Sequence, residues 1–523
     1  MSTPANGAEA LLHAAHTLGV RVCFANPGTT ELALVRALDE VPGIRPVLGL
    51  FEGVCTGAAD GYARVLGKPA LTLLHLGPGL ANGLANLHNA RRAHSPIINL
   101  VGDHATWHLQ YDAPLTSDIE SLAAPMSAHV MRLESTETVV SSMREAVAFS
   151  LAPSGGVVTL IAPSDLMEDP AEGDSSSLAS WAPVKAVRPP SPQKVIETAS
   201  RLQAGGPAII LLGSNALSER AQRAALQIAQ RTGARLMMES YPAIVPLGGD
   251  LPRLERLAYF PDDVMHQLGD SSVVLVGTRT PVSYFGYAGQ PSHLVRPERL
   301  QLLASPGEDC PLALEELAQR LSETPNRSAA GVAPPSFARE QSTALSPTAI
   351  AETLVEQMPE NAIVSLEGST AGGPYLQRAH RARRHRVMTN TGGAIGQGLP
   401  CAVGAAVAAP DARVICLQSD GSAQYTVQAL WTMAREGLNI TVIICANHRY
   451  GILQTELRRG GAALERHATA RLTQLDTPRV DWVALANGYG VTASRATTID
   501  EFREALTIGL QTRGPYLIEA QLT

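Results

Sequence analysis

The chain has few aromatic residues and lacks the sequence patterns of several protein classes. Only 4 % of its 523 residues are aromatic, and its net charge of −7 includes no block of basic residues. This charge pattern argues against a nucleic-acid partner. No uncharged apolar stretch reaches the roughly 18 residues of a transmembrane helix. The first residues carry no signal-peptide pattern, so neither membrane spanning nor secretion is expected.

The six cysteines follow no metal-binding spacing, and most lie in apolar segments. A reduced thiol in such a segment behaves as a small hydrophobic side chain, so we expect a reducing cytoplasm. The chain does have 45 % apolar residues and 45 glycines, a composition typical of closely packed α/β layers. Its length predicts about three domains.

Two segments rich in Ser, Pro and Ala divide the chain, and we predict that both are exposed linkers. They cover residues 171–192 and 323–347. The remaining blocks, 1–170, 193–322 and 348–523, each alternate strand-like and helix-like segments. Such alternation predicts three doubly wound α/β domains built on parallel sheets.

Two apolar segments in the last block end in polar residues, and their spacing is the most informative feature of the chain. Ser-Asp-Gly-Ser at 419–422 follows a strand predicted over 414–418, and Ala-Asn-His-Arg at 446–449 follows one predicted over 440–445. A helix predicted over 423–436 connects them. Asp420 and Asn447 would therefore end adjacent parallel strands at one edge of a sheet.

The residues at this edge suit a divalent cation. The carboxylate of Asp420, the side-chain amide of Asn447 and a nearby backbone carbonyl, assigned here to Arg449, form a hard oxygen set that binds Mg²⁺ and leaves positions open for a diphosphate. Each half of the pattern also occurs as an ordinary turn or helix cap.

A second group of residues lies far away, at Glu52. This glutamate precedes Ala-Ala-Asp-Gly-Tyr-Ala-Arg at 58–64. Together the two motifs resemble those of the thiamine-diphosphate (ThDP) enzymes of the pyruvate decarboxylase and acetolactate synthase superfamily. The sequence departs from the family at Ser419 and Ala446, where a glycine and an asparagine are usual. Without the resemblance, Glu52 would be explained as a helix N-terminal acid favoured by the helix dipole.

The resemblance covers essentially the whole chain and is locally strongest to benzoylformate decarboxylase. It implies pyrimidine-binding, central and diphosphate-binding domains in that order. Glu52 would hydrogen-bond the aminopyrimidine ring and take part in proton transfer. Thr29 would stand where the family has a substrate-contacting serine, and His75 where it has an active-site histidine. A structural histidine is the alternative for His75.

Further residues are expected to bind the cofactor. Ser369 and Thr370 follow a strand, and Gly421 and Ser422 start a helix, where hydroxyls and amides suit a diphosphate. In the loop Gly392–Gly396 the glycines allow close approach. The resemblance implies that the Gly393 carbonyl contacts the aminopyrimidine and that Ile395 holds the cofactor bent, although ordinary core packing would also explain Ile395. The expected cofactor-binding set is Glu52, Ser369, Thr370, Gly393, Ile395, Asp420, Gly421, Ser422 and Asn447.

The likeness to benzoylformate decarboxylase fails at the substrate side. By register, its two aromatic pocket positions fall on Thr389 and Glu456, and an alanine near the cofactor falls on Ile452. A phenyl substrate would lose stacking there and meet a carboxylate, so benzoylformate is a poor candidate. The segment 281–287 offers no counterpart of the family's proton-shuttling histidine. Its Tyr284 or Tyr287 would either supply a hydroxyl or simply pack.

Two functions are compatible with these motifs. The leading one is a ThDP- and Mg²⁺-dependent decarboxylase or carboligase, a lyase or C–C bond-forming transferase that removes CO₂ from a 2-oxo acid. The alternative, favoured by Ser419 and Ala446, is a catalytically reduced homologue acting as a binding or regulatory subunit. FAD, which synthase relatives bind, is possible but not indicated, since no FAD motif is distinguishable in the central block. The resemblance implies a homodimer or a dimer of dimers, such as a homotetramer, with active sites between subunits.

Overall fold

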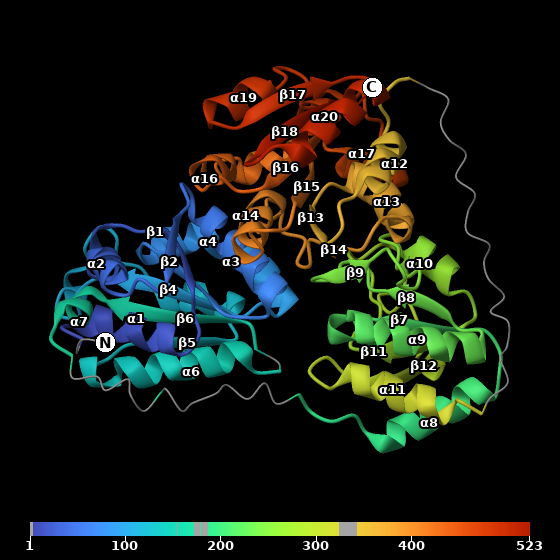
Figure 1. Cartoon of the computed structure of the whole chain (residues 1–523), viewed down its shortest axis with the longest axis horizontal. Helices are drawn as coiled ribbons and strands as arrows, with labels where there is room; N and C mark the ends of the chain where they lie inside the picture. The colour runs from blue at the N-terminus through green and yellow to red at the C-terminus, as the bar shows by residue number, and fades with distance from the viewer. Residues whose placement is uncertain (1–3, 154, 172–177, 179–186, 324–342, 523) are drawn as a thin grey trace.

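Apolar segments rich in Val, Ile and Leu form the strands of three sheets, as buried parallel strands require. The computed structural model of the chain describes residues 4–153, 155–171, 178, 187–323 and 343–522. Most of both predicted linkers lies outside these residues, so the domain boundaries stay predictions. Figure 1 shows the third domain above and between the first and central domains.

The first domain is a six-stranded parallel sheet with the order β2-β1-β3-β4-β6-β5. One face is covered by α1, α2, α6 and α7 and the other by α3, α4 and α5, as the two apolar cores on either side show. The strands are β1 (Val22–Asn26), β2 (Arg45–Leu48), β3 (Ala70–Leu74), β4 (Ile97–Asp103), β5 (His129–Arg132) and β6 (Val157–Pro163). The helices are α1 (Gly7–Thr17), α2 (Leu32–Glu40), α3 (Glu52–Leu66), α4 (Leu76–Ala93), α5 (Ile119–Ala123), α6 (Val139–Leu151) and α7 (Ser164–Glu168).

The central domain is a five-stranded parallel sheet with the order β10-β8-β7-β11-β12. Its strands are β7 (Ala208–Leu212), β8 (Arg235–Met238), β10 (Glu255–Arg256), β11 (Ser272–Val276) and β12 (Leu300–Ala304). Its helices are α8 (Pro192–Gln203), α9 (Glu219–Thr232), α10 (Pro261–Leu268) and α11 (Cys310–Arg320).

The third domain is a sheet with the order β17-β18-β16-β15-β13-β14-β9. Its parallel strands are β13 (Ala362–Leu366), β14 (His385–Met388), β15 (Val414–Ser419), β16 (Ile440–Ala446), β17 (Thr492–Ala496) and β18 (Tyr516–Gln521). The helices are α12 (Pro347–Gln357), α13 (Ser369–Arg378), α14 (Gly398–Ala408), α15 (Asp420–Ala423), α16 (Ala429–Arg435), α17 (Gly451–Arg459), α18 (His467–Thr473), α19 (Trp482–Gly488) and α20 (Ile499–Gln511).

Two features of the third domain differ from the expected pattern. Its edge strand β9 (Val245–Leu247) comes from the central block and pairs antiparallel with β14. Pro246 lacks an N–H and is tolerated there because the strand lies at an edge. The single helix predicted over 423–436 is divided into the end of α15, a 3-10 turn over Gln424–Thr426 and α16. The Thr426 hydroxyl donates to the Gly396 carbonyl at 2.8 Å and so binds this segment to a neighbouring loop.

The first and third domains pack closely along α3 and α14 (Figure 1). An added Cβ at Gly404 of α14 would lie 1.8 Å from the Ala58 carbonyl oxygen, and one at Gly61 of α3 would lie 2.2 Å from that of Cys401. Glycine is therefore required on both helices for this contact. Within the described residues, no helix has the length and apolarity needed to cross a bilayer.

Candidate active site

The carboxyl ends of β15 and β16 place Asp420 and Asn447 side by side, as the sequence predicts. The two strands pair in parallel up to Ser419 and Cys445. Asp420 is only 5 % exposed. Its Oδ1 accepts a hydrogen bond from the Gly421 N–H at 2.9 Å, and its Oδ2 accepts one from the His448 N–H at 2.7 Å. Burial raises the pKa of the Asp420 carboxyl, while these hydrogen bonds oppose the shift.

Asn447 connects this pair to the end of β13. Its Nδ2 donates to the Thr370 hydroxyl oxygen at 3.1 Å, and its Oδ1 accepts from the Arg449 N–H at 3.1 Å. Ser369 starts α13 beside Thr370. The hydroxyl of Ser422 donates to Gln418 Oε1 at 2.8 Å. Three strand ends therefore converge at the point where the strand order reverses, where α/β sheets bind ligands.

The donor set at this edge fits a cation that brings its own oxygen ligands. In the described part of the chain, no three Asp, Glu, His or Cys side chains form a metal-binding group. One carboxylate and one amide leave most positions of an octahedral ion unfilled, which suits Mg²⁺ carried on a diphosphate.

Glu52 and His75 lie together in the first domain. Glu52 begins α3 and is 8 % exposed, and its Oε2 accepts a hydrogen bond from Asn82 Nδ2 at 3.0 Å. His75 precedes α4. An added Cβ at Gly79 would lie 3.1 Å from Glu52 Oε1 and 3.4 Å from His75 Cβ, so the two side chains flank this glycine.

Glu31 orients His75, and the sequence analysis missed it. Its Oε2 lies 2.8 Å from His75 Nδ1 and also accepts the Gly28 N–H at 2.7 Å. A carboxylate only accepts, so this contact assigns a hydrogen to Nδ1 and leaves Nε2 for other partners. The hydroxyl of Thr30 lies 3.3 Å from Nδ1, whereas Thr29 is exposed. The sequence places this acid three residues after Gly28 but shows neither its burial nor its contact with His75, which lies 44 residues further along the chain.

The loop from Thr389 to Gly398, called here the 389–398 loop, carries Gly393 and Ile395. Gly393 has φ of 77° and Gly396 has φ of 103°, values that favour glycine. Ile395 is 43 % exposed, so core packing does not explain it. An added Cβ at Gly393 would lie 2.1 Å from the Tyr284 hydroxyl oxygen, so this tyrosine of the central domain contacts the loop.

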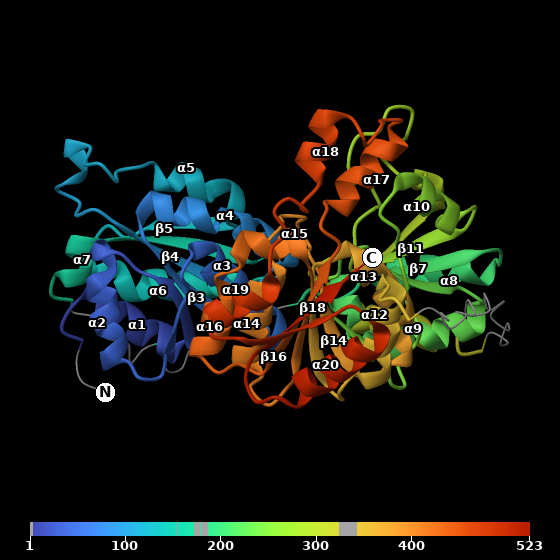
Figure 2. The same cartoon turned by 90° about the horizontal axis from the view of Figure 1, so that it is seen from above.

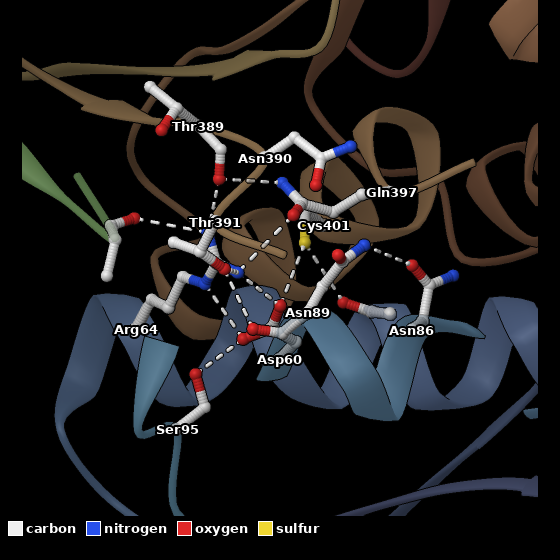
Figure 3. Close-up of polar contacts among 12 residues, drawn as sticks. Asp60, Arg64, Asn86, Asn89, Ser95, Thr389, Asn390, Thr391, Gln397 and Cys401 are labelled. Atoms are coloured by element: carbon white, nitrogen blue, oxygen red, sulfur yellow. Dashed lines mark hydrogen bonds and ion pairs between the residues drawn. The ribbon is translucent and has the colours of Figure 1, made fainter. Parts of the chain in front are cut away.

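Figure 3 shows a buried network that holds the 389–398 loop against α3. Arg64 and Asp60 form an ion pair at 2.5 Å with almost no exposed side-chain surface. Arg64 also donates to the Thr389 carbonyl at 2.7 Å and to the Thr391 hydroxyl at 3.1 Å. Asn89 of α4 brackets Ala394, donating to its carbonyl at 2.8 Å and accepting its N–H at 3.1 Å. The first domain thus fixes the shape of a loop in the third.

The predicted site residues form two groups. Within the described residues, no hydrogen bond or ion pair joins Glu52 or His75 to Asp420 or Asn447. Arg449 is exposed and forms a β-bridge with Gln474.

Comparison with known proteins gives the family. Residues 5–123 match the N-terminal TPP-binding domain of thiamine pyrophosphate enzymes, and residues 371–520 match the C-terminal TPP-binding domain. A Mycobacterium tuberculosis protein named "Putative acetolactate synthase large subunit IlvX" is 45 % identical over 517 residues, covering 98 % of both chains. The chain belongs to the thiamine-diphosphate-dependent enzyme family.

More distant members of this ThDP family support the fold across the whole length. Benzoylformate decarboxylase of Pseudomonas aeruginosa is 28 % identical over 521 residues and covers 96 % of each chain. The crystal structure of benzoylformate decarboxylase from Polynucleobacter necessarius superposes with a TM-score of 0.85 at 25 % identity, covering 99 % of both chains. The predicted family and the three-domain α/β fold are therefore confirmed.

The two residues that register places at the substrate side, Thr389 and Glu456, lie in different surroundings. Thr389, placed by register at an aromatic pocket position, is 2 % exposed, and its hydroxyl donates to the Pro242 carbonyl at 2.8 Å. It therefore joins the third domain to the central block instead of lining an open surface. Glu456 of α17 does lie at an accessible place, with its Oε1 accepting from the Tyr287 hydroxyl at 2.9 Å. Seen from above, α17 stands beside α10 of the central domain (Figure 2), and Arg459 pairs with Asp262 there at 2.7 Å.

The carboxyl edge of the central sheet carries an enclosed acid. Doubly wound domains bind nucleotides at this edge, and here Glu239 follows β8. Its Oε2 accepts from the Thr278 hydroxyl at 3.2 Å and would lie 2.7 Å from a Cβ added at Gly213. The carboxyl group thus fills the space beside β7 and would repel a diphosphate whenever it is ionised.

Glu239 also makes the stability of the central domain depend on pH. Burial raises its pKa to about 7. The pKa of Glu239 in the folded protein lies above its value in the unfolded chain. The contribution of Glu239 to the free energy of unfolding is therefore complete below about pH 4.5, where the carboxyl group is protonated in both states. It is lost as the pH rises through 7, and the free energy of unfolding falls by up to about 3 kcal/mol. Glu239→Gln should remove this loss and unfold at higher urea than wild type at pH 8, but not at pH 5. The exposed control Glu298→Gln should unfold at the same urea concentration as wild type at pH 5 and at pH 8. If Glu239→Gln shows the same pH dependence of unfolding as wild type, Glu239 is not its cause.

Proposed function

We propose that the chain is a ThDP- and Mg²⁺-dependent 2-oxo acid decarboxylase or carboligase, working in a reducing cytoplasm that suits its six buried free thiols. The observation that carries the proposal is the convergence of Asp420, Asn447 and Thr370 at three strand ends. It supplies oxygen ligands for a metal and a hydroxyl for a diphosphate. Retention of Glu52 in a second, first-domain group argues against a catalytically reduced homologue.

Each group of residues would have its own task. Bound ThDP supplies an electron sink for breaking the carbon–carbon bond when CO₂ leaves. Asp420, Asn447 and the Arg449 carbonyl would hold Mg²⁺, with Ser369, Thr370, Gly421 and Ser422 around the diphosphate. Gly393 and Ile395 would fix the orientation of the cofactor rings, which is a proximity effect.

The first-domain group would handle protons. Glu52, buried against Asn82, would share a proton with the aminopyrimidine ring. His75, held by Glu31 through Nδ1, would present Nε2 to accept a proton or, once protonated, to donate one to the substrate. Thr29 remains a proposed substrate contact on the exposed turn before Glu31.

The substrate side of the site combines aromatic and polar groups. Tyr284 contacts the 389–398 loop, and Tyr287 bonds Glu456 one helical turn beyond Ile452. A carboxylate at this position would disfavour an unsubstituted phenyl ring. We therefore expect benzoylformate to be a poor substrate and a 2-oxo acid with a polar side chain to be better.

The function is tested by loading and turnover. The purified protein is titrated with ThDP and Mg²⁺ while its circular dichroism is followed, and CO₂ release is then measured from a panel of 2-oxo acids. Mass spectrometry of the products separates an aldehyde, the decarboxylase product, from a longer hydroxyketone, the carboligase product. Cofactor binding without turnover of any 2-oxo acid would favour the regulatory homologue.

We also propose that each active site lies between subunits of a homodimer or dimer of dimers. ThDP would be held at its pyrimidine by Glu52 of one subunit and at its diphosphate by Asp420 of the other, so a two-fold axis gives two equivalent sites. Mixing inactive Glu52→Gln with inactive Asp420→Ala under subunit exchange should restore one intact site in each mixed dimer. Verified heterodimers without any recovered activity would place the whole site in one chain.

A further inference from the structure

The carboxylate of Glu367 receives an unusual number of hydrogen bonds. This residue directly follows β13, at the edge where the candidate site lies, and is largely enclosed. Five donors reach its two oxygens: the N–H groups of Gly396 (2.6 Å), Gln397 (3.1 Å) and Gly398 (2.7 Å), Nε2 of Gln418 (2.6 Å) and Nδ2 of Asn390 (3.4 Å).

Three of these donors are the successive backbone N–H groups of Gly396, Gln397 and Gly398, which lead into α14 and begin it. The first N–H groups of a helix have no partner within it and carry the positive end of its dipole. Glu367 caps them from a different segment, so the N-terminus of α14 is occupied by a protein carboxylate. Burial raises the pKa of Glu367, and the hydrogen bonds from Gln418 and the backbone oppose the shift.

The 389–398 loop is therefore held from two sides by opposite charges. Glu367 binds its N–H groups from within the third domain, while Arg64 binds the Thr389 carbonyl and the Thr391 hydroxyl from the first domain (Figure 3). Between these two anchors lie Gly393 and Ile395. The glycines of this segment have positive φ angles. Without these two anchors the segment would readily adopt other conformations, since glycine has the largest conformational freedom.

We propose that Glu367 is a positioning residue that sets the 389–398 loop in its cofactor-binding shape before the cofactor arrives. It acts through the loop, because its own oxygens are already taken by five donors. Preorganisation of this kind lowers the cost of ordering on binding and so strengthens affinity. The inference rests on the proposed function, in which Gly393 and Ile395 contact the ring end of ThDP.

The test separates the two ends of the cofactor. Glu367→Gln keeps the size of the side chain but offers one acceptor oxygen and an NH₂ group that faces existing donors. Calorimetry in Mg²⁺ should show ThDP binding about 10- to 100-fold more weakly than to wild type. Binding of inorganic pyrophosphate, which uses only the diphosphate end, should be unchanged. Asp420→Ala, by contrast, should weaken both.

A matched control tests whether replacing any buried glutamate of the third domain weakens ThDP binding to the same extent. Glu519 of β18 is 1 % exposed and accepts from Arg495 Nε at 3.0 Å, and no contact joins it to the loop in the described residues. Glu519→Gln should lower thermal stability without changing ThDP affinity.

A second variant serves if Glu367→Gln does not fold. Glu367→Asp keeps the negative charge on a shorter side chain and should bind ThDP more weakly than wild type.

Three negative results are distinguishable. If wild type binds ThDP and folded Glu367→Gln, or Glu367→Asp in its place, binds it equally tightly, the positioning role is overturned and the proposed function stands. Equal losses for ThDP and pyrophosphate would also overturn it, because they would indicate general disruption. If wild type itself binds no ThDP, the proposed function fails and the inference fails with it.

Discussion

Glu52→Gln should lower turnover by about 10²- to 10⁴-fold while leaving the fold intact, the range expected when a general acid/base step is removed. The glutamine retains the size of the side chain and can still accept from Asn82, but it cannot share a proton. Turnover of the best 2-oxo acid at saturating ThDP and Mg²⁺ measures the effect, and circular dichroism checks the fold.

The control addresses the helix-dipole explanation of Glu52. Glu219 begins α9 as Glu52 begins α3, so it meets the same positive helix end but lies far from the proposed chemistry. Glu219→Gln should lose stability at the helix start and in its pairs with Arg223 and Arg384, and should keep its activity. Wild-type turnover in Glu52→Gln would show that the acid serves only the helix.

Asp420→Ala should abolish Mg²⁺-dependent retention of ThDP. Asp420 carries the only full charge among the proposed metal ligands, and Mg²⁺ binds poorly to a site of neutral oxygens alone. The variant also leaves the N–H groups of Gly421 and His448 without their acceptor. Calorimetry with and without EDTA should show a large Mg²⁺ effect for wild type and none for the variant.

Asp481→Ala is the control for Asp420→Ala. Asp481 caps the N-terminus of α19 in the same domain, and its loss should cost only about 1 kcal/mol of stability. ThDP retention should remain as in wild type. Equal affinity of wild type and Asp420→Ala for ThDP in the presence of Mg²⁺ would remove Asp420 from the site.

The sequence predicts the site residues best where a local strand pattern and the connection between neighbouring strands indicate the same position. Asp420 and Asn447 could be placed together because both follow short apolar strands joined by one helical connection, and parallel strands end at the same edge. The strand predicted over 440–445 matches β16 to within one residue, since a run of buried aliphatic residues between turns has few alternatives.

Residues whose role depends on distant backbone could not be found this way. Glu31 and Glu367 act through hydrogen bonds to His75 and to the start of α14, and neither partner is close in sequence. The burial of Thr389 and its bond to Pro242 could not be predicted, because a register taken from relatives gives no information on burial. The helix predicted over 423–436 is divided where Thr426 contacts Gly396, a tertiary contact that local propensity does not reveal.

The antiparallel edge strand β9 affects how the chain can be divided. A fragment cut at the predicted boundary before residue 348 would lack Val245–Leu247 and leave β14 as a bare edge with unpaired N–H and C=O groups, a surface prone to aggregation. The sheet of the third domain is therefore incomplete without the strand that the central block supplies. Rotation of the central domain away from the third would have to break main-chain hydrogen bonds, so these two domains should unfold as one cooperative unit.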